Sequence, residues 1–324
     1  MTGQEQINDG LLLAGLDGAN PLAFLAALGT LRGLTIVWPR RRVRLSWKLQ
    51  DTWRPCLYVD DGVLDEEKVL DGLERFMEMR PGHEALKIGD NLTIPADKFR
   101  VYAQDAAETA SAPFSGRAGA DFIAAFGCDA VARREGQYKG QVQDTALRTM
   151  SGTGHQHFLR TMRDLAEKVD RDKLRQCSFV QWERQDPQLS LRWDPEDDRR
   201  YALRWRNPSD DKVSAKGEKS GAPTDWGANR LAYEALPLFS VMPVGRSVQT
   251  TGFSGSSSRD TSWTWPIWDV PAGLDTVRSL LALRKLQESS PDRRELAAMG
   301  IKQVFKSWRI TIGQYRNFTP STPV

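Results

Sequence analysis

The sequence is poor in the residues that build disulfide frameworks and metal centres. Its 324 residues include only three histidines and three cysteines, and Cys56, Cys128 and Cys177 are far apart in the chain. An odd and scattered set of cysteines argues against a disulfide-stapled fold and favours a reducing compartment. We therefore expect a cytoplasmic protein.

Long hydrophobic runs are also missing. A membrane-spanning helix needs about 20 mostly apolar residues, and the longest candidate, Pro21 to Leu34, is interrupted by Thr30 and Arg32. The first ten residues, MTGQEQINDG, are polar and do not resemble a signal peptide. We expect no contact with a membrane.

The familiar signatures of catalysis are absent as well. The sequence contains no Gly-x-Ser-x-Gly elbow, no P-loop and no dinucleotide-binding fingerprint. His155 and His157 form the closest approach to a metal motif, but a zinc site needs three or four ligands. We expect neither a cofactor nor a catalytic set, and a metal-dependent nuclease built on these two histidines is the enzymatic alternative.

What the sequence does hold is a mixture of helix and strand patterns. Asn20 followed by Pro21 is the start signal of a helix, which we expect to end at Gly33. Around it the patterns predict strands at 11–16, 35–38, 43–48 and 56–59 and an amphipathic helix over 64–79.

The second half continues in the same way. We expect helices over 155–169, 229–236 and 274–287, and extended segments at 177–182, 189–193, 201–205, 248–253, 262–268 and 302–318. The order predicts an α+β fold with mixed or antiparallel sheets and interspersed helices. We divide the chain into an N-terminal α+β region, 1–150, and a C-terminal α+β region, 151–324, which could also form one domain.

Basic residues gather in blocks, although the net charge is only +3. Seven basic residues and one acid lie between Arg32 and Arg54, and the alternation over 43–48 puts basic side chains on one face of a strand. Such a face suits phosphate groups, although it can also be a simple solvated surface. From this block we predict phosphate contacts by Arg40, Arg41, Arg42, Arg44 and Lys48.

Two polar loops extend this hypothesis. The stretch 207–225 has no periodicity, which is typical of a loop that orders on a ligand, and 254–258 is rich in serine and glycine. We predict further phosphate contacts by Lys212, Lys216 and Lys219. The candidates for reading a DNA groove are Asn207, Ser256, Ser257 and Arg259.

A glycine-containing turn comes just before the helix expected over 155–169. Glycines let backbone N–H groups approach an anion, and a helix N-terminus attracts negative charge. The possible phosphate or anion site consists of Ser151, Thr153, His155 and Gln156. An ordinary helix cap would use the same kinds of residue.

Tryptophan is abundant, and several tryptophans stand beside a basic residue. The chain has eleven, with pairs such as Trp47–Lys48 and Trp308–Arg309. Basic grooves with stacking aromatic rings bind single-stranded nucleic acid, whereas a buried tryptophan only fills a core. Together with the basic blocks, these pairs favour nucleic acid as the ligand.

Three stretches resemble the type I-U (also called I-G) CRISPR-associated proteins. They are GLDGANPLAFLAALGTLRGL at 15–34, SGTGHQHFLRTMRDL at 151–165, and the run from LAYEALPLFSVMPVG to WTWPIWDVP at 231–271. The chain is similar there to a short large-subunit-like or accessory component of the crRNA-guided surveillance (Cascade) complex.

This resemblance implies an irregular, large-subunit-like architecture and a role in antiviral defence without catalysis. Such a subunit recognises the protospacer-adjacent motif in target double-stranded DNA and helps to open the duplex, while base pairing with crRNA reads the sequence. The implied partners are the backbone and guide-end subunits, crRNA, target DNA and a helicase-nuclease. A purely structural or accessory subunit of the same complex is the alternative.

Overall fold

The computed structural model describes residues 10–112, 116–136, 138–150, 157–196, 224–255, 260–288, 290–312 and 315–324. Helices and antiparallel strands are interspersed along the chain, which confirms the predicted α+β class. The helices are α1 (Pro21–Val37), α2 (Glu66–Met79), α3 (Ala96–Ser111), α4 (Ala118–Phe126), α5 (Phe158–Lys168), α6 (Arg171–Phe179), α7 (Trp226–Tyr233), α8 (Leu274–Leu281) and α9 (Arg293–Ala298), with the 3₁₀ turns η1 (His83–Lys87), η3 (Leu236–Leu238) and η4 (Arg284–Gln287).

The strands form small antiparallel sheets. The strands are β1 (Leu11–Leu12), β2 (Arg44–Leu49), β3 (Trp53–Tyr58), β4 (Gly127–Ala132), β5 (Val142–Asp144), β6 (Val241–Val244), β7 (Ser247–Thr250), β8 (Phe253–Ser254), β9 (Ser262–Trp268), β10 (Ile301–Ile312), β11 (Tyr315–Phe318) and β12 (Thr322–Pro323). One sheet has the order β1-β3-β2 and a second the order β11-β10-β9-β8, with β12 also paired to β10. β4 pairs with β5 and β6 with β7, each as a separate hairpin.

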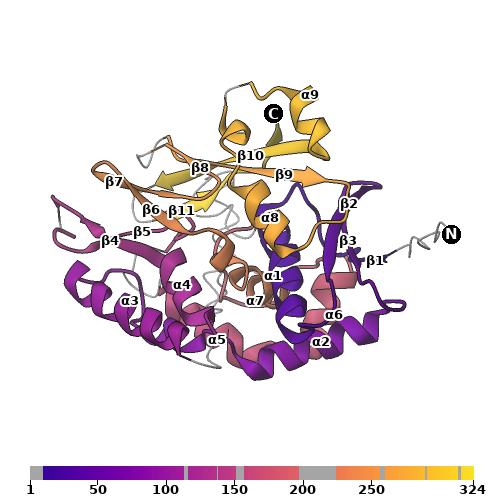
Figure 1. The fold of residues 1–324 in the computed structure, drawn as a ribbon, viewed down its shortest axis with the longest axis horizontal. Coiled ribbons are helices and arrows are strands. Elements are labelled where there is room, and N and C mark those ends of the chain that lie inside the picture. Colours follow the sequence, from indigo (N-terminus) through magenta and orange to yellow (C-terminus); the bar gives the residue numbers. More distant parts are fainter. Residues whose placement is uncertain are drawn as a thin grey trace, which may run out of the picture.

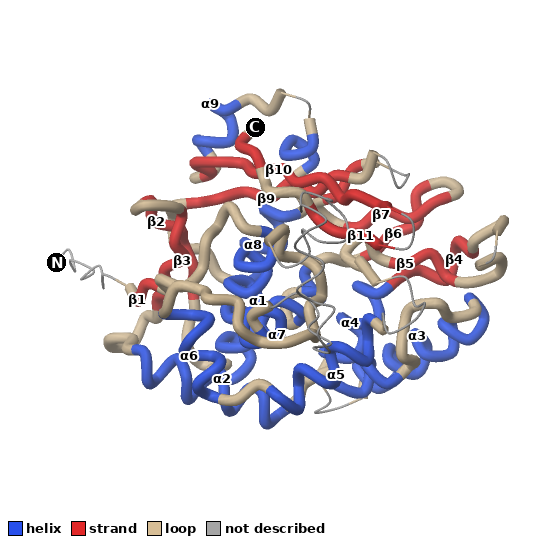
Figure 2. The backbone as a smooth tube through the Cα atoms, turned by 180° about the vertical axis from the view of Figure 1, so that it is seen from behind, coloured by secondary structure: helices blue, strands red, loops and turns tan. Residues whose placement is uncertain are grey.

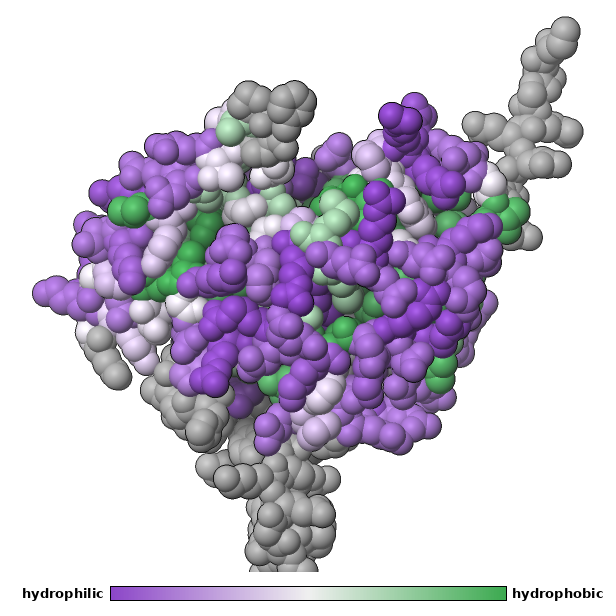
Figure 3. All heavy atoms as spheres, turned by 90° about the horizontal axis from the view of Figure 1, so that it is seen from below, coloured by the Kyte–Doolittle hydropathy of each residue, from purple (hydrophilic) through white to green (hydrophobic). Residues whose placement is uncertain are grey.

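The second sheet and the two hairpins lie above, and α2, α3, α5 and α6 form the opposite side, with α1 and α7 between them (Figure 1, Figure 2). Seen from that helical side, hydrophilic residues cover most of the surface, and hydrophobic residues show only in smaller areas between them (Figure 3). This is the expected outer face of a helical layer whose apolar stripes point inward.

Helix α1 is the centre of the fold, and its start was predicted correctly. The side chain of Asn20 accepts hydrogen bonds from the N–H groups of Leu22 and Ala23, and Pro21 takes the first helical position. The helix does not end at Gly33, however, and continues to Val37, so the strand predicted at 35–38 is wrong. A side chain at Gly33 would come within 2.9 Å of Phe76 on α2, so this glycine permits close helix packing instead of ending the helix.

Helices α1 and α7 cross at very short range. A Cβ atom at Gly29 would lie 1.8 Å from the carbonyl oxygen of Leu231, which means that only glycine permits this approach. The short helix predicted over 229–236 is confirmed as α7, which begins after the N-cap Asp225. The crossing fixes the position of the polar side chains that α7 carries.

Several predicted strands and helices are confirmed with shifted boundaries. The segments at 43–48, 56–59, 248–253, 262–268 and 302–318 correspond to β2, β3, β7 with β8, β9, and β10 with β11. The helix over 64–79 is α2, and that over 274–287 is α8 followed by η4. The strand predicted at 11–16 is reduced to β1, and the helix predicted from 155 is described from Phe158 onward as α5.

Two predicted strands in the second half are wrong. Residues 177–179 are the end of α6, and 180–182 follow the helix without forming a strand. The helix begins where the side chain of Asp170 accepts a hydrogen bond from the N–H of Lys173. Residues 189–193 form a loop, because Leu189 and Arg192 adopt positive φ values of 53° and 58°, which a strand does not allow. The segment 201–205 lies outside the described residues.

One cluster of buried side chains draws on both halves of the chain. Phe24 and Trp47 pack with Trp263, Trp265 and Trp268, with ring centroids 4.6–6.5 Å apart. Residues on both sides of position 150 therefore share a core, and the boundary at 150 stays a prediction. Within the described residues, no helix has the length and apolar character needed to cross a membrane.

Candidate nucleic-acid interface

Arginines gather around one aspartate where the β4–β5 hairpin meets the β10–β11 hairpin. We call Arg133, Arg148, Arg309, Arg316 and Asp144 the arginine cluster. In the second hairpin Arg309 pairs in register with Phe318, two positions from Arg316, so both arginines share a face with that residue. Because Phe318 is fully buried, this face points toward the interior.

Asp144 forms ion pairs with two of the arginines. Its Oδ1 accepts a hydrogen bond from Arg133 Nη2 at 2.7 Å, and its Oδ2 lies 2.5 Å from Arg148 Nε. The side chains of Asp144 and Arg148 are 4% and 3% exposed, whereas that of Arg133 is 31% exposed. Charge-assisted pairs of this kind are strong. Here they hold the buried carboxylate of Asp144 between the buried Arg148 and Arg133, which reaches the surface.

The other two arginines have only neutral acceptors among the described residues. Arg309 donates from Nη1 to the carbonyl oxygen of Ala146 at 2.9 Å and from Nη2 to Oγ1 of Thr261 at 3.4 Å. Arg316 donates from Nη1 to the carbonyl oxygen of Arg148 at 3.5 Å. Neither forms an ion pair within the described part of the chain, so their positive charges are not cancelled by direct contact.

The electrostatics reflect this excess. Burial and then the charge of Arg316 lower the pKa of Arg309 to about 10, with Asp144 opposing the shift. Burial also lowers the pKa of Arg316, and Arg148 and Arg133 act in the same direction. Arg309 and Arg316 stay protonated at pH 7. Together with Arg133 and Arg148 they set four guanidinium groups against one carboxylate. A half-buried excess of this kind is unfavourable until an anion shares the site.

Unsatisfied polar atoms lie in the same place. Arg309 Nε and Thr311 Oγ1 are buried without a hydrogen-bond partner in the described structure, and both residues lie on the inward face of β10. Buried polar atoms normally find a partner. These two remain unsatisfied in the described structure.

The turn that follows β4 carries the basic character outward. Arg133 N donates to the carbonyl oxygen of Gln141 and Gly140 N donates to that of Arg133, which closes the turn. Arg134 and Lys139 lie on it and are exposed, together with the acid Glu135. A ligand that reaches the arginine cluster would meet these cations first.

The basic residues predicted near the N-terminus lie elsewhere, at the opposite end of the molecule on and before β2 (Figure 1, Figure 2). Three of them are paired with acids: Arg41 Nε is 3.2 Å from Asp61, while Arg42 Nε is 3.7 Å and Arg44 Nη2 2.5 Å from Asp60. Arg40 and Lys48 are exposed, and Lys48 Nζ lies 5.9 Å from the ring centroid of Tyr58. This block therefore keeps less unpaired charge than the sequence suggested.

The other predicted site residues cannot be placed, because they lie outside the described residues. They are Ser151, Thr153, His155 and Gln156 of the anion turn, Asn207, Lys212, Lys216 and Lys219 of the long polar stretch, and Ser256, Ser257 and Arg259 of the serine-rich loop. Their predicted contacts with phosphate and with a DNA groove stay predictions.

Two tryptophans that stand beside a basic residue, Trp47 and Trp193, are core residues, and so are three that do not. Trp47, Trp193, Trp263, Trp265 and Trp268 are at most 1% exposed, so these rings cannot stack on a base. On the outer part of β10, by contrast, Trp308 is 44% exposed, and Lys306 Nζ lies 4.6 Å from its ring centroid. A basic side chain over an exposed ring is suitable for stacking a base.

The arginine cluster was not predicted from the sequence. Its members are separated by up to 183 positions, from Arg133 to Arg316, and a basic residue alone gives no sign of its distant neighbours. A signal did exist in the tail, where Arg309 and Arg316 fall on the face that Phe318 marks as inward. An ionic residue on the inward face of a strand usually has a special role.

Metal chemistry has no assembled site in the described part of the chain. No group of three or more His, Cys, Asp and Glu side chains is gathered there to hold an ion, and His155 lies outside it. His157 precedes α5 and makes no capping hydrogen bond with its side chain. No protein-family model matches the chain, and no curated protein matches it.

Proposed function

We propose that the chain binds the phosphate backbone of nucleic acid as a non-catalytic subunit of a type I CRISPR surveillance complex. In that role it would contact target DNA at the protospacer-adjacent motif, assist duplex opening and bind neighbouring subunits. The observation that carries the nucleic-acid part is the arginine cluster, where four arginines face one aspartate. The place in the complex rests on the resemblance of the three stretches named above.

Arginine is well suited to this task. Its planar guanidinium presents several N–H donors in a fixed fork that matches the oxygens of a phosphate. Arg133 reaches the surface, and Arg309 keeps a buried Nε without a partner in the described structure. Phosphate contacts of this type position a protein on nucleic acid, whereas contacts with base edges provide specificity.

The basic block at Arg40–Lys48 has a secondary part in this proposal. A phosphate would have to displace Asp60 or Asp61 from the arginines that these acids pair with. Such exposed pairs are weak, about 0–1 kcal/mol, so displacement is feasible but reduces the gain. Changing Arg40, Arg41 and Arg42 together to alanine should therefore weaken DNA binding less than changes in the arginine cluster do.

The test compares two variants that remove the same charge from different places. Arg133→Gln with Arg316→Gln opens the arginine cluster, whereas Arg171→Gln with Arg175→Gln removes two arginines that pair with acids of α2. Binding of a labelled DNA duplex and of a labelled RNA strand is measured by fluorescence anisotropy. At about 1.5 kcal/mol or more for each charge-assisted hydrogen bond, the first variant should lose on the order of 100-fold in affinity.

The control variant should bind almost as the wild type does. Equal losses in both variants would mean that only the overall charge matters, and unchanged binding in the first would contradict the assignment. Co-purification with complex subunits but no DNA affinity in the wild type would favour a purely structural subunit.

A further inference from the structure

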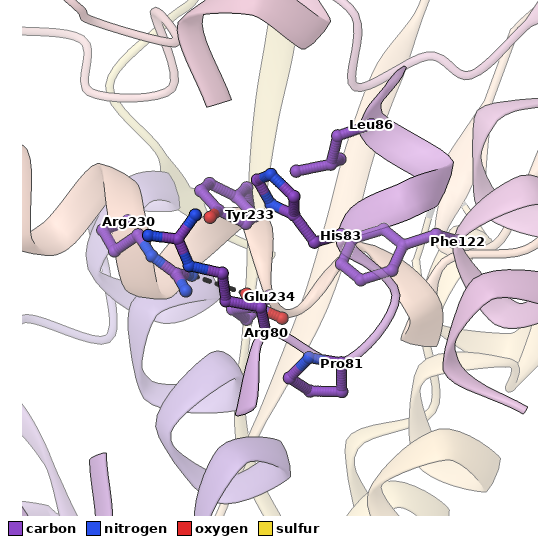
Figure 4. Close-up of a pocket in the computed structure, with 8 residues that line it drawn as sticks. All are labelled: Arg80, Pro81, His83, Leu86, Phe122, Arg230, Tyr233 and Glu234. Atoms are coloured by element: carbon purple, nitrogen blue, oxygen red, sulfur yellow. Dashed lines mark hydrogen bonds and ion pairs between the residues drawn. The ribbon is translucent and has the colours of Figure 1, made fainter. Parts of the chain in front are cut away.

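A second cationic site lies in a small cavity between α7, α4 and the segment that follows α2. It is lined by Arg80, Pro81, His83, Leu86, Phe122, Arg230, Tyr233 and Glu234 (Figure 4). Figure 4 shows Arg80 and Arg230 reaching toward the same part of the cavity as the Tyr233 hydroxyl. Polar groups from two separate segments therefore converge on one small space, and α4 adds the apolar Phe122.

Buried charges beside the cavity do not balance. Glu234 accepts from Arg230 Nη1 at 2.5 Å through Oε1, and from Arg32 Nη1 at 2.9 Å through Oε2. These three side chains are only 2–4% exposed. Two buried arginines thus share one carboxylate, which leaves one positive charge inside the protein, where an uncompensated charge is costly.

The neighbouring groups do not supply the missing negative charge. Arg80 pairs with Glu167 at the surface, with Nη1 to Oε1 at 2.5 Å, and so cancels that carboxylate. Asp121, which also acts on Arg32, pairs with Arg117 at 2.9 Å. The pair at the surface therefore adds a donor near the cavity but no net charge.

The remaining groups at the cavity are donors or neutral. Burial raises the pKa of Tyr233, so its hydroxyl stays protonated and can donate. Burial and the charges of Arg80 and Lys87 lower the pKa of His83, so that its ring is neutral at pH 7. Arg230 Nε is buried without a hydrogen-bond partner in the described structure. A donor that is fully buried and unsatisfied beside a cavity points to a missing acceptor.

The size of the cavity narrows the choice of acceptor. The cavity volume is about 10 Å³, which is room for about one water-sized ligand and not for a phosphate group. We propose that this cavity is a binding site for a single small monovalent anion of the halide class, held by Arg230, Tyr233 and Arg80. One such ion would neutralise the one excess charge and give the unsatisfied Arg230 Nε an acceptor.

The inference is independent of nucleic-acid binding and can be tested in solution on the whole chain. The midpoint of thermal unfolding is measured over a range of sodium chloride and sodium bromide concentrations, with sodium gluconate keeping the ionic strength constant. Gluconate is too large for the cavity. A ligand that binds only the folded state raises the midpoint in a saturable way, so the halides should raise it by a few degrees while gluconate should not.

Variants assign the effect to the cavity. Tyr233→Phe and Arg80→Gln each remove one donor and should reduce or abolish the halide dependence, whatever they do to the absolute midpoint. Arg100→Gln is the matched control, because Arg100 is also an arginine paired with an acid at the surface, 2.7 Å from Asp129. It should keep the full halide dependence, and so should the Arg133→Gln, Arg316→Gln variant, which keeps chloride binding at the arginine cluster from being mistaken for this site.

Two results would overturn the proposal. Equal midpoints in halide and gluconate at every concentration would mean that water fills the cavity. A halide effect that survives in both Tyr233→Phe and Arg80→Gln would place the anion elsewhere.

Discussion

Replacing Asp225 by asparagine should stabilise the protein at neutral pH. Asp225 is the N-cap of α7, where its side chain accepts a hydrogen bond from the N–H of Ala228 at 2.8 Å, and it is only 6% exposed. Burial raises the pKa of its carboxyl from 3.8 to about 6, and Asp186 adds to the shift, while Ala228 N–H and Lys173 oppose it. Asparagine keeps the capping oxygen without the charge.

The magnitude follows from the shift. The folded protein holds this proton more tightly than the unfolded chain, so the unfolding free energy falls as pH rises from about 4 to about 6 and is level above that range. A shift of about two pKa units corresponds to about 3 kcal/mol at pH 7. The variant should therefore exceed the wild type by about 3 kcal/mol at pH 7 and by well under 1 kcal/mol at pH 4.

Urea unfolding at pH 4, 5, 6 and 7 measures this difference directly. Asp170→Asn is a useful control, because Asp170 caps α6 in the same way but is exposed, and it reports the effect of exchanging a surface cap. A difference between Asp225→Asn and wild type that does not change with pH, or a variant less stable at pH 7, would refute the reasoning.

Two further predictions concern the packing and the buried charges. Gly29→Ala should destabilise the protein by about 1–3 kcal/mol or more, because its Cβ would meet the carbonyl oxygen of Leu231 at 1.8 Å. Gly119→Ala changes a helical glycine with open space around it, and it should instead be neutral or stabilising by up to about 1 kcal/mol. Urea unfolding measures both variants. Glu234→Gln should cost about 3–5 kcal/mol because it leaves two buried arginines without their carboxylate. Glu167→Gln, which breaks a surface pair, should cost less than about 1 kcal/mol, and a similar loss in both would show that the buried site is not special.

The residues that start a helix act locally, so the beginnings of helices could be predicted from the sequence. Where a helix ends depends also on contacts with distant residues, which the sequence does not show. Asn20 and Pro21 signal the start of α1 because a cap acts within its own turn. Gly33 looks like a helix end, but it continues the helix because Phe76 of α2 lies against it. The strand expected at 177–182 is wrong for a similar reason: Cys177 lies on the buried side of α6, which the exposed cap Asp170 begins, whereas Val180 beyond the helix is 50% exposed.

The candidate site was less predictable than the fold. The sequence shows where basic residues are dense, and that density pointed to Arg40–Lys48. In the fold, Asp60 and Asp61 form ion pairs with three arginines of this block. The arginine cluster combines residues in and beside two hairpins that are far apart in the sequence but meet in the fold. Its excess positive charge depends on how few acids lie beside these arginines. Only the folded chain reveals that balance.

The salt dependence of DNA binding tests the proposed role most directly. Each phosphate contact that is lost should reduce the slope of log affinity against log salt by about 0.9 for duplex DNA. Relative to the wild type, Arg133→Gln with Arg316→Gln should therefore reduce the magnitude of this negative slope by about 1.8. Arg171→Gln with Arg175→Gln should leave it unchanged. The same slope in the wild type and in both variants would contradict phosphate binding at the arginine cluster.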